Sequence, residues 1–292
     1  MKPPLFEYIF PTTIEEAVAA RAAHDYSAIL AGGQSLIPTM NFRIANPGAL
    51  IDISGIEALR GIRVEDGDVV IGAMARQRDV ELDDAVHRAN PLIREALQNV
   101  AHVPIRNRGT IVGSLAHADA AAEMPAVLLA TGGRVIAHGP DGVRTVDADD
   151  LFQFHMTTSL APEEIVTEAR FPVLADNTGW AFLEFTRRHG DYAIAGVAAL
   201  ITLAADGSCT QAALAACGIG SRAVRLPESE ASLVGRQLGE ATIKAAAEAA
   251  KPAVTAPDDS HATTAFRQHV LGTVLTRAVG IARQRATERQ GT

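Results

Sequence analysis

The first informative stretch of the sequence is Ile29-Leu30-Ala31-Gly32-Gly33-Gln34-Ser35-Leu36-Ile37-Pro38. The same pattern of residues occurs in a second stretch, Arg106-Asn107-Arg108-Gly109-Thr110-Ile111-Val112-Gly113-Ser114-Leu115-Ala116-His117. In each, an apolar run breaks into glycine beside a small hydroxyl residue. Such loops expose backbone N–H groups that no Cβ shields, and they form concave sites for anions. Two of them in one domain can hold the two phosphates of a dinucleotide from opposite sides. The sequence therefore predicts a protein that carries a nucleotide cofactor.

Composition narrows the class of protein. A chain of 292 residues predicts about two domains, and a hydrophobic content of 48% is enough to build their cores. The net charge is −8 and no basic stripe occurs, which disfavours a nucleic-acid partner. No apolar run approaches the roughly 20 residues that a membrane span needs, and the first residues lack the apolar region of a secretion signal. We therefore expect a cytoplasmic protein without a membrane span.

The two cysteines, Cys209 and Cys217, do not form a C-x-x-C motif. Two thiols cannot build a four-thiolate zinc or iron–sulfur site within one chain. Both lie on predicted strands, where a thiol behaves as a small hydrophobic residue. We expect both cysteines to be buried.

The order of predicted elements suggests two domains that differ in the length and arrangement of their strands and helices. Thr13-Ile14-Glu15-Glu16 fits a capping box that begins a helix over 14–24, and a buried strand follows at 27–31. Beyond a boundary near 172–179, long strands are predicted at 180–188, 193–204 and 211–218, with helices at 239–250 and 263–285. The prediction is an α+β chain with domains 1–176 and 177–287, the second built on a three-stranded antiparallel sheet packed on helices.

Two further patterns look functional but are better explained structurally. Gly218-Ile219-Gly220-Ser221-Arg222-Ala223 matches the Gly-x-Gly-x-x-Ala fingerprint, but no helix follows it, so a turn at the end of a strand is favoured. His117, Asp119 and Glu123 have a spacing that resembles a metal site but lack a further strong ligand, so no metal site is predicted. Glu123 is instead suited to accept hydrogen bonds from sugar or polyol hydroxyls.

Taken in order, Ala31 to Ser35, Arg106 to Ser114, Leu160 to Ile165 and Gly190-Asp191-Tyr192-Ala193 resemble the FAD-binding medium subunit of the molybdenum hydroxylases. This is the family of the carbon monoxide dehydrogenase and xanthine dehydrogenase flavoprotein subunits. The resemblance covers essentially the whole chain. It implies a two-subdomain FAD-binding fold of the vanillyl-alcohol oxidase (PCMH) type, followed by a smaller C-terminal α+β domain.

The resemblance also implies which residues bind the cofactor. The two glycine loops would grip the pyrophosphate, Glu123 would be an acidic FAD contact, and Leu160 would lie near a backbone contact. Arg187 or Arg188 falls where relatives place a basic residue close to the flavin, and Tyr192 would lie against the isoalloxazine ring. The implied set is Leu30, Ala31, Gly32, Gly33, Gln34, Ser35, Leu36, Thr110, Ile111, Gly113, Ser114, Glu123, Leu160, Arg187 and Tyr192, with no catalytic or metal-binding residue in this chain.

The chain departs from the family pattern in both loops. Gln34 stands where the carbon monoxide enzymes have His, and Val112 and Ser114 replace Gly and Asp of a Thr-Ile-Gly-Gly-Asp form. We expect FAD binding to survive these changes. Carbon monoxide is not carried over as the substrate, and a heteroaromatic compound, an aldehyde or a purine all fit.

The implied function is electron transfer within a larger enzyme. A large partner with a molybdenum cofactor would oxidise the organic substrate, a small partner with [2Fe-2S] clusters would pass on the electrons, and FAD in this chain would deliver them to an external acceptor. The assembly implied is a dimer of heterotrimers. Two alternatives stay open from the residues: a stand-alone FAD-dependent oxidase or reductase of the same fold, and a non-catalytic nucleotide-binding assembly module.

Overall fold

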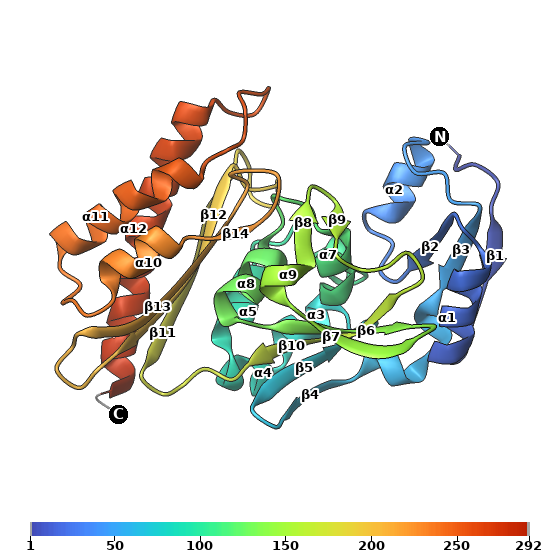
Figure 1. Ribbon diagram of the computed structural model, residues 1–292, viewed down its shortest axis with the longest axis horizontal. Coiled ribbons are helices and arrows are strands. Elements are labelled where there is room, and N and C mark those ends of the chain that lie inside the picture. Colours follow the sequence, from blue (N-terminus) through green and yellow to red (C-terminus); the bar gives the residue numbers. More distant parts are fainter. Residues whose placement is uncertain (1, 291–292) are drawn as a thin grey trace.

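The structure, a computed structural model, describes residues 2–290. Three blocks lie side by side along the longest axis (Figure 1). A small N-terminal subdomain stands at one end, a larger antiparallel subdomain in the middle, and the C-terminal domain at the other end. Within the described residues, the strands make a three-, a five- and a four-stranded sheet and one two-stranded pair.

The N-terminal subdomain is a parallel sheet in the order β1-β3-β2. Its helix α1 begins at the predicted capping box, since Glu16 N donates to Thr13 Oγ1 at 3.1 Å and Thr13 N donates to Glu16 Oε2 at 3.3 Å. The predicted strand is β2, which ends directly before the first glycine loop, but the prediction that it is buried is wrong, because all four of its residues are only partly buried. The elements are β1 (Glu7–Ile9), α1 (Ile14–Ala23), β2 (Ser27–Leu30), α2 (Leu36–Asn41) and β3 (Ala49–Asp52).

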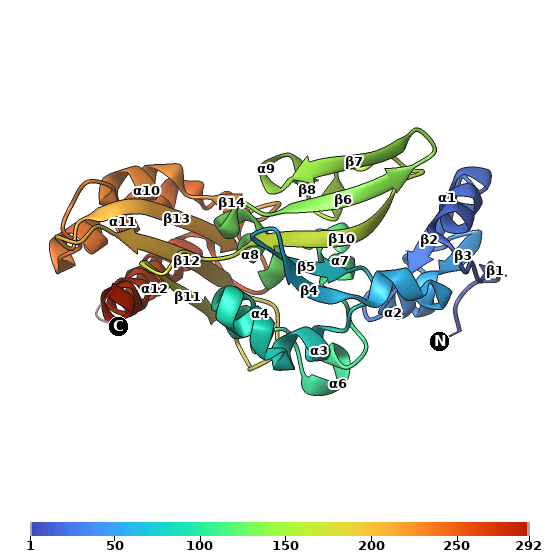
Figure 2. The ribbon, with the colours of Figure 1, turned by 90° about the horizontal axis from the view of Figure 1, so that it is seen from below.

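The middle subdomain is an antiparallel sheet in the order β4-β5-β10-β6-β7, visible from below in Figure 2. All five residues of β5 are buried, which explains the apolar run Val69-Val70-Ile71. The chain enters this sheet early and returns to its centre much later with β10. The strands are β4 (Ile62–Glu65), β5 (Asp68–Gly72), β6 (Arg134–Gly139), β7 (Gly142–Asp147), β8 (Phe152–Phe154), β9 (Thr157–Thr158) and β10 (Ile165–Pro172).

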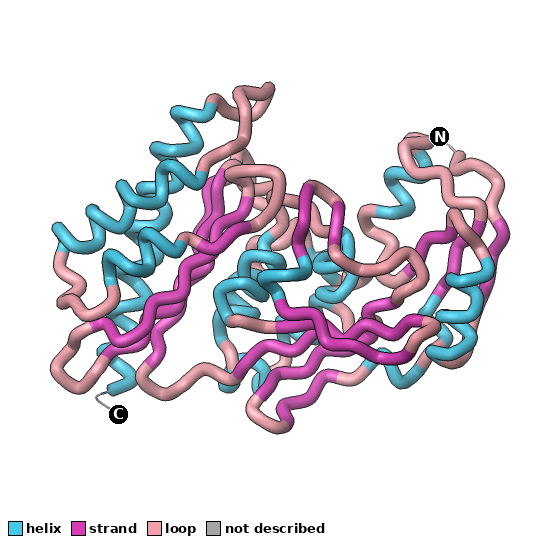
Figure 3. The backbone as a smooth tube through the Cα atoms, viewed as in Figure 1, coloured by secondary structure: helices cyan, strands magenta, loops and turns pink. Residues whose placement is uncertain are grey.

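Short helices join the strands of the middle subdomain, and most of them lie between β5 and β6 in the chain (Figure 3). The most buried of them is α8, whose residues from Glu123 to Ala130 are all buried. It packs against α5 and α7 on one side and against β12, β13 and β14 of the C-terminal domain on the other, so it joins the two domains. The helices are η1 (Ile53–Gly55), η2 (Glu57–Arg60), α3 (Gln77–Leu82), α4 (Asp84–Ala89), α5 (Pro91–Leu97), α6 (Val103–Arg106), α7 (Ile111–His117), α8 (Glu123–Thr131) and α9 (Ala148–Leu151).

The C-terminal domain is an antiparallel sheet covered by helices, as predicted in kind. The long helix α12 packs along β11 and β12, and α10 and α11 pack against each other beside it. Both cysteines are buried on β13, as predicted. The elements are β11 (Thr178–Phe185), β12 (Ala195–Leu203), β13 (Cys209–Cys217), β14 (Val224–Arg225), α10 (Pro227–Leu233), α11 (Glu240–Ala250), η3 (Lys251–Ala253) and α12 (Thr264–Gln290).

The prediction of three strands in this sheet is wrong, because the described residues contain a fourth. Gly218 adopts a φ of +76° and turns the chain after β13, as the turn interpretation of the Gly-x-Gly segment predicted. The chain then returns alongside as β14, with Ala215 paired to Arg225. Leu226 N also donates to Leu214 O at 2.9 Å. A strand of two residues carries no periodicity of its own, which is why the sequence pattern missed it.

The buried apolar residues form two cores, one on each face of the C-terminal sheet. One core joins the middle subdomain to one face of the C-terminal sheet, and the other lies between that sheet and its helices. Among the described residues, no helix is both long enough and apolar enough to cross a membrane.

Candidate functional site

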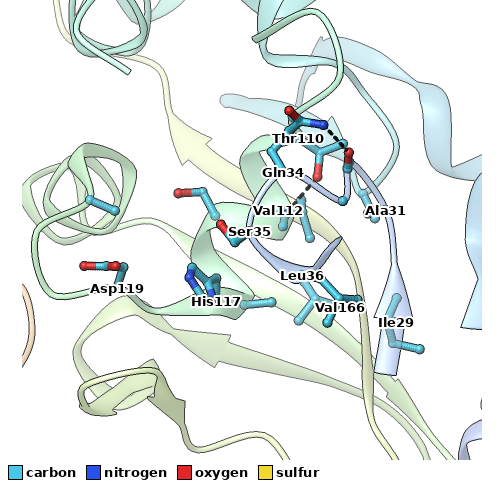
Figure 4. Close-up of a pocket in the computed structure, with 18 of the residues that line it drawn as sticks. Ile29, Ala31, Gln34, Ser35, Leu36, Thr110, Val112, His117, Asp119 and Val166 are labelled. Atoms are coloured by element: carbon cyan, nitrogen blue, oxygen red, sulfur yellow. Dashed lines mark hydrogen bonds between the residues drawn. The ribbon is translucent and has the colours of Figure 1, made fainter. Parts of the chain in front are cut away.

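A cavity of about 680 Å³ opens between the two subdomains of the first domain. Its walls come from β2 and the loop after it, from the start of α7, from the segment before β10, and from residues 190–192 that precede β12. Figure 4 shows the two glycine-containing stretches meeting at one side of it. The volume falls in the range of about 300–1,000 Å³ that is usual for ligand pockets.

The first loop is pressed against the second, and glycine is what allows the contact. A Cβ on Gly32 would stand 2.6 Å from the carbonyl oxygen of Arg108 and 2.7 Å from Cα of Gly109. Gly33 has a φ of +71°, a conformation that glycine adopts without strain. The side chain of Gln34 folds back, and its Nε2 donates to Gly32 O at 3.0 Å (Figure 4). The two predicted loops therefore form one continuous wall.

The second stretch is less open than a loop, because α7 begins inside it. Thr110 caps this helix, and its Oγ1 accepts a hydrogen bond from Gly113 N at 3.0 Å. A Cβ on Gly113 would stand 2.7 Å from the same oxygen, so a larger residue there would require the Thr110 side chain to shift. Ile111 is fully buried in the core, whereas Ser114 lines the cavity.

The arginines in and beside the cavity bind other groups of the protein. Arg106 is buried and its Nε lies 2.9 Å from Glu81 Oε2, so it is a structural ion-pair residue. Among the described residues that line the cavity, Arg21 is the only Arg or Lys, and its Nη1 donates to Ser27 Oγ at 3.0 Å. A bound pyrophosphate would thus be met chiefly by backbone N–H dipoles and hydroxyls.

Two acidic residues, Asp119 and Glu123, line the cavity, and Glu184 lies near Glu123 outside the lining. Glu123 is 4% exposed, and burial, followed by the nearby Asp119 charge, raises its pKa to about 7. Burial also raises the pKa of Glu184 to about 8, with a further contribution from Glu123. The pKa of Tyr192 rises to about 12 through desolvation first and then the Asp119 and Glu123 charges. Its hydroxyl interacts with Ser35 and Asp119, so this residue of the second domain reaches across the cavity.

The structure brings most of the predicted residues to this cavity and leaves three outside its lining. The lining includes Ala31, Gly32, Gly33, Gln34, Ser35, Leu36, Thr110, Gly113, Ser114, Glu123, Leu160 and Tyr192. Leu30 and Ile111 are not in it. Arg187 is not in it either, because its Nη2 donates to the carbonyl oxygens of Ser260 and His261 at 2.6 and 2.9 Å.

Other lining residues carry no motif and were missed. Ser27, Ala28 and Ile29 of β2 all line the cavity, whereas Leu30 does not. Because these three residues are consecutive, the alternation of an extended strand could not have selected them from the sequence. Gln77 and Val166 come from α3 and β10, and only the folded chain brings them to the site.

Comparison with known proteins identifies the family. The family described as "FAD binding domain in molybdopterin dehydrogenase" matches residues 4–174, and "CO dehydrogenase flavoprotein C-terminal domain" matches residues 180–282. The chain is 40% identical over 287 residues to 6-hydroxypseudooxynicotine dehydrogenase complex subunit alpha of Paenarthrobacter nicotinovorans, which covers 98% of this chain and 97% of that protein.

Two further comparisons agree with this match. Caffeine dehydrogenase subunit beta of a Pseudomonas species is 37% identical, over 98% of this chain and 97% of that one. Carbon monoxide dehydrogenase from Hydrogenophaga pseudoflava has a chain that superimposes with a TM-score of 0.95 at 37% identity, over 98% of this chain and 99% of that one. The chain belongs to the FAD-binding flavoprotein subunits of the molybdenum hydroxylases, oxidoreductases in which this subunit transfers electrons.

Proposed function

We propose that FAD binds in the cavity between the subdomains, with its pyrophosphate against the wall made by the two glycine loops. The observation that supports this most is the contact of Gly32 with Gly109, because it removes side chains from both loops at one point. A diphosphate needs such close backbone approach when cations are scarce. FAD, when bound, supplies the redox chemistry of the subunit, and the protein binds and orients it.

The chain's own groups suit the parts of this cofactor. Ser35 lines the cavity, and within the described residues its side chain makes no capping hydrogen bond to the first turn of α2, so its hydroxyl can turn from Tyr192 to donate to a phosphate. Glu123 offers a buried acceptor for hydroxyl groups. Tyr192 stands at the rim with 58% of its surface exposed, in a position to lie against a flat ring. Leu160 contributes an apolar contact near the segment that precedes β10.

Arg187 has a different role in this proposal. Its bonds to Ser260 and His261 tie the segment that carries Tyr192 to the loop before α12. It would hold that segment in place instead of contacting the flavin.

The assembly proposed is that of the relatives' larger enzymes. Several relatives are named as medium chains or as subunits of dehydrogenase complexes. We propose a large partner with a molybdenum cofactor, a small partner with [2Fe-2S] clusters, a dimer of such heterotrimers, and a cytoplasmic location. Electrons would pass from the clusters through FAD to an external acceptor.

The test is purification of the tagged full chain from its host under mild conditions, followed by mass spectrometry, metal analysis and a visible spectrum. We expect a large molybdenum-containing chain and a small iron–sulfur chain to accompany it, with about one FAD per copy. A yellow protein that arrives alone and oxidises a substrate would indicate a stand-alone oxidase. A colourless protein that takes up no added FAD would overturn the proposal.

A matched pair of variants tests the placement of the pyrophosphate. Ser35→Ala removes a hydroxyl from the cavity wall, whereas Ser260→Ala removes one from an exposed loop. A hydrogen bond to a charged group contributes about 1.5–3 kcal/mol, so we expect FAD to dissociate at least about tenfold more readily from the first variant. Equal dissociation constants for the two variants would contradict this placement.

A further inference from the structure

His117 is an imidazole on the cavity wall whose ring nitrogens have no partner in the described part of the protein. It is the last residue of α7 and the only histidine in the described lining. In the view of Figure 4 its ring lies between Asp119 and Ser35. Neither ring nitrogen makes a hydrogen bond within the described residues, and neither is enclosed by the protein. A ligand in the cavity therefore meets a side chain whose donor and acceptor are both free.

The ring carries no charge at neutral pH. Burial lowers the pKa of His117 below its ordinary 6.5, although the nearby Asp119 charge acts in the opposite direction. A neutral imidazole has a donor N–H on one nitrogen and an acceptor on the other. It suits a hydroxyl group, which also donates and accepts. It suits a diphosphate less, because hydrogen bonds to an anion are strongest when the donor is a cation.

The place of His117 along α7 matches the chain that joins the flavin ring to the pyrophosphate. Ser114 and His117 are three residues apart, so they lie on one face of the helix, about 4.5 Å apart along its axis. Ser114 lines the cavity beside Gly113, near the wall proposed for the pyrophosphate, and Asp119, which interacts with Tyr192, follows the end of α7. The part of FAD between pyrophosphate and flavin ring is the ribityl chain, which carries hydroxyl groups.

We infer that His117 is a further cofactor-binding residue, whose imidazole forms a hydrogen bond with a ribityl hydroxyl and so positions the flavin half of FAD beside Tyr192. The inference rests on the proposed binding of FAD in this cavity. It explains why a polar ring without a partner in the described residues stands at the end of α7. The contact belongs to the flavin half of the cofactor, which FMN shares, and not to the adenylate half.

The test compares three variants of the FAD-free full chain. His117→Leu removes both nitrogens at similar volume, His117→Gln keeps a donor and an acceptor, and His269→Leu makes the first change at an exposed position. We expect the dissociation constant for FAD, measured by quenching of flavin fluorescence, to rise about three- to tenfold for His117→Leu only. FMN should be weakened by the same factor, because it carries the same ribityl chain. The urea midpoint of FAD-free His117→Leu should not fall, because the substitution breaks no hydrogen bond within the described protein.

A rise of less than twofold for His117→Leu would overturn the inference. An equal rise for His117→Leu and His117→Gln would also overturn it, because the shape of the side chain and not its hydrogen bond would then control binding. Weaker binding of FAD without weaker binding of FMN would place the contact in the adenylate half and contradict the assignment. If His117→Leu does not unfold cooperatively, His117→Phe takes its place under the same criteria. Failure of the unaltered chain to bind FAD would instead overturn the proposed function.

Discussion

The buried carboxyl of Glu123 predicts a pH-dependent loss of stability that a single substitution removes. Glu123 is the first residue of α8 and is 4% exposed. Its pKa rises from an ordinary 4.5 to about 7, mainly because burial penalises the charged form. A difference of about 2.5 between the two states, at about 1.4 kcal/mol for each pKa unit, corresponds to about 3 kcal/mol.

The sign follows from the direction of the shift. Below about pH 4.5 the carboxyl is protonated in both the folded and the unfolded chain, and it does not affect their balance. As the pH rises towards 7, the unfolded chain ionises freely while folding still holds the proton, so stability falls and then levels off. Glu123→Gln cannot ionise. Its free energy of unfolding should exceed that of the unaltered chain by about 1 kcal/mol at pH 5 and by about 3 kcal/mol at pH 8.

The assay is urea unfolding of the FAD-free full chain and of Glu123→Gln at both pH values. Comparing the two proteins at each pH cancels the contributions of groups that Glu123 does not touch. Glu57→Gln is the control, because it makes the same change at a carboxyl whose side chain is 89% exposed. If the free energy of unfolding of Glu123→Gln exceeded that of the unaltered chain by the same amount at pH 5 and pH 8, the raised pKa of Glu123 would be contradicted.

Three other perturbations follow from the geometry. Gly32→Ala places a Cβ against the backbone of the second loop, so we expect the free energy of unfolding in urea to fall by about 1–3 kcal/mol and the FAD content to be lower. Gly280→Ala is the control, because open space surrounds Gly280 and alanine there should stabilise α12 by about 1 kcal/mol. Arg106→Met leaves the buried Glu81 carboxylate with a single partner, and should cost about 3 kcal/mol by the same assay, against a negligible change for an exposed arginine. Tyr192→Ala should make the fluorescence of bound flavin more accessible to iodide quenching, and Tyr192→Phe should not. Equal quenching of the two variants would contradict the contact between the Tyr192 ring and the flavin.

The parts of the fold that depend on local chemistry could be predicted from the sequence. The capping box at Thr13 and Glu16 names a helix start because both bonds lie within four residues. Gly32 and Gly33 alone are weak evidence, because a Gly-Gly pair after a strand is more often just a turn, and the second glycine stretch is what makes them informative. The long strands of the C-terminal domain repeat an apolar pattern often enough to be found.

Features that depend on contacts between distant segments could not be predicted. β14 exists only because β13 offers an edge for it. Gln77 reaches the cavity because α3 lies against the second glycine loop, 32 residues further along the chain. The family resemblance predicts that Arg187 contacts the flavin, but its guanidinium donates hydrogen bonds to the carbonyl oxygens of Ser260 and His261.

The C-terminal domain is part of the site as well as a neighbour of it. α8 carries Glu123 at its start, and its other side rests on the C-terminal sheet. Gly218 N at the end of β13 donates to Ala120 O at 2.8 Å, which fixes the segment between Asp119 and Glu123.

Contacts at the opposite edge of the same sheet also join the C-terminal domain to the first domain. Arg285 of α12 lies over the Trp180 ring at 4.9 Å and pairs with Glu95 of α5 at 2.6 Å. The Glu95 carboxylate also accepts a hydrogen bond from Phe182 N at 3.1 Å, so α5, β11 and α12 meet at one charged group. Glu123 on α8 and Tyr192 before β12 both line the cavity, so residues of both domains contribute to its walls.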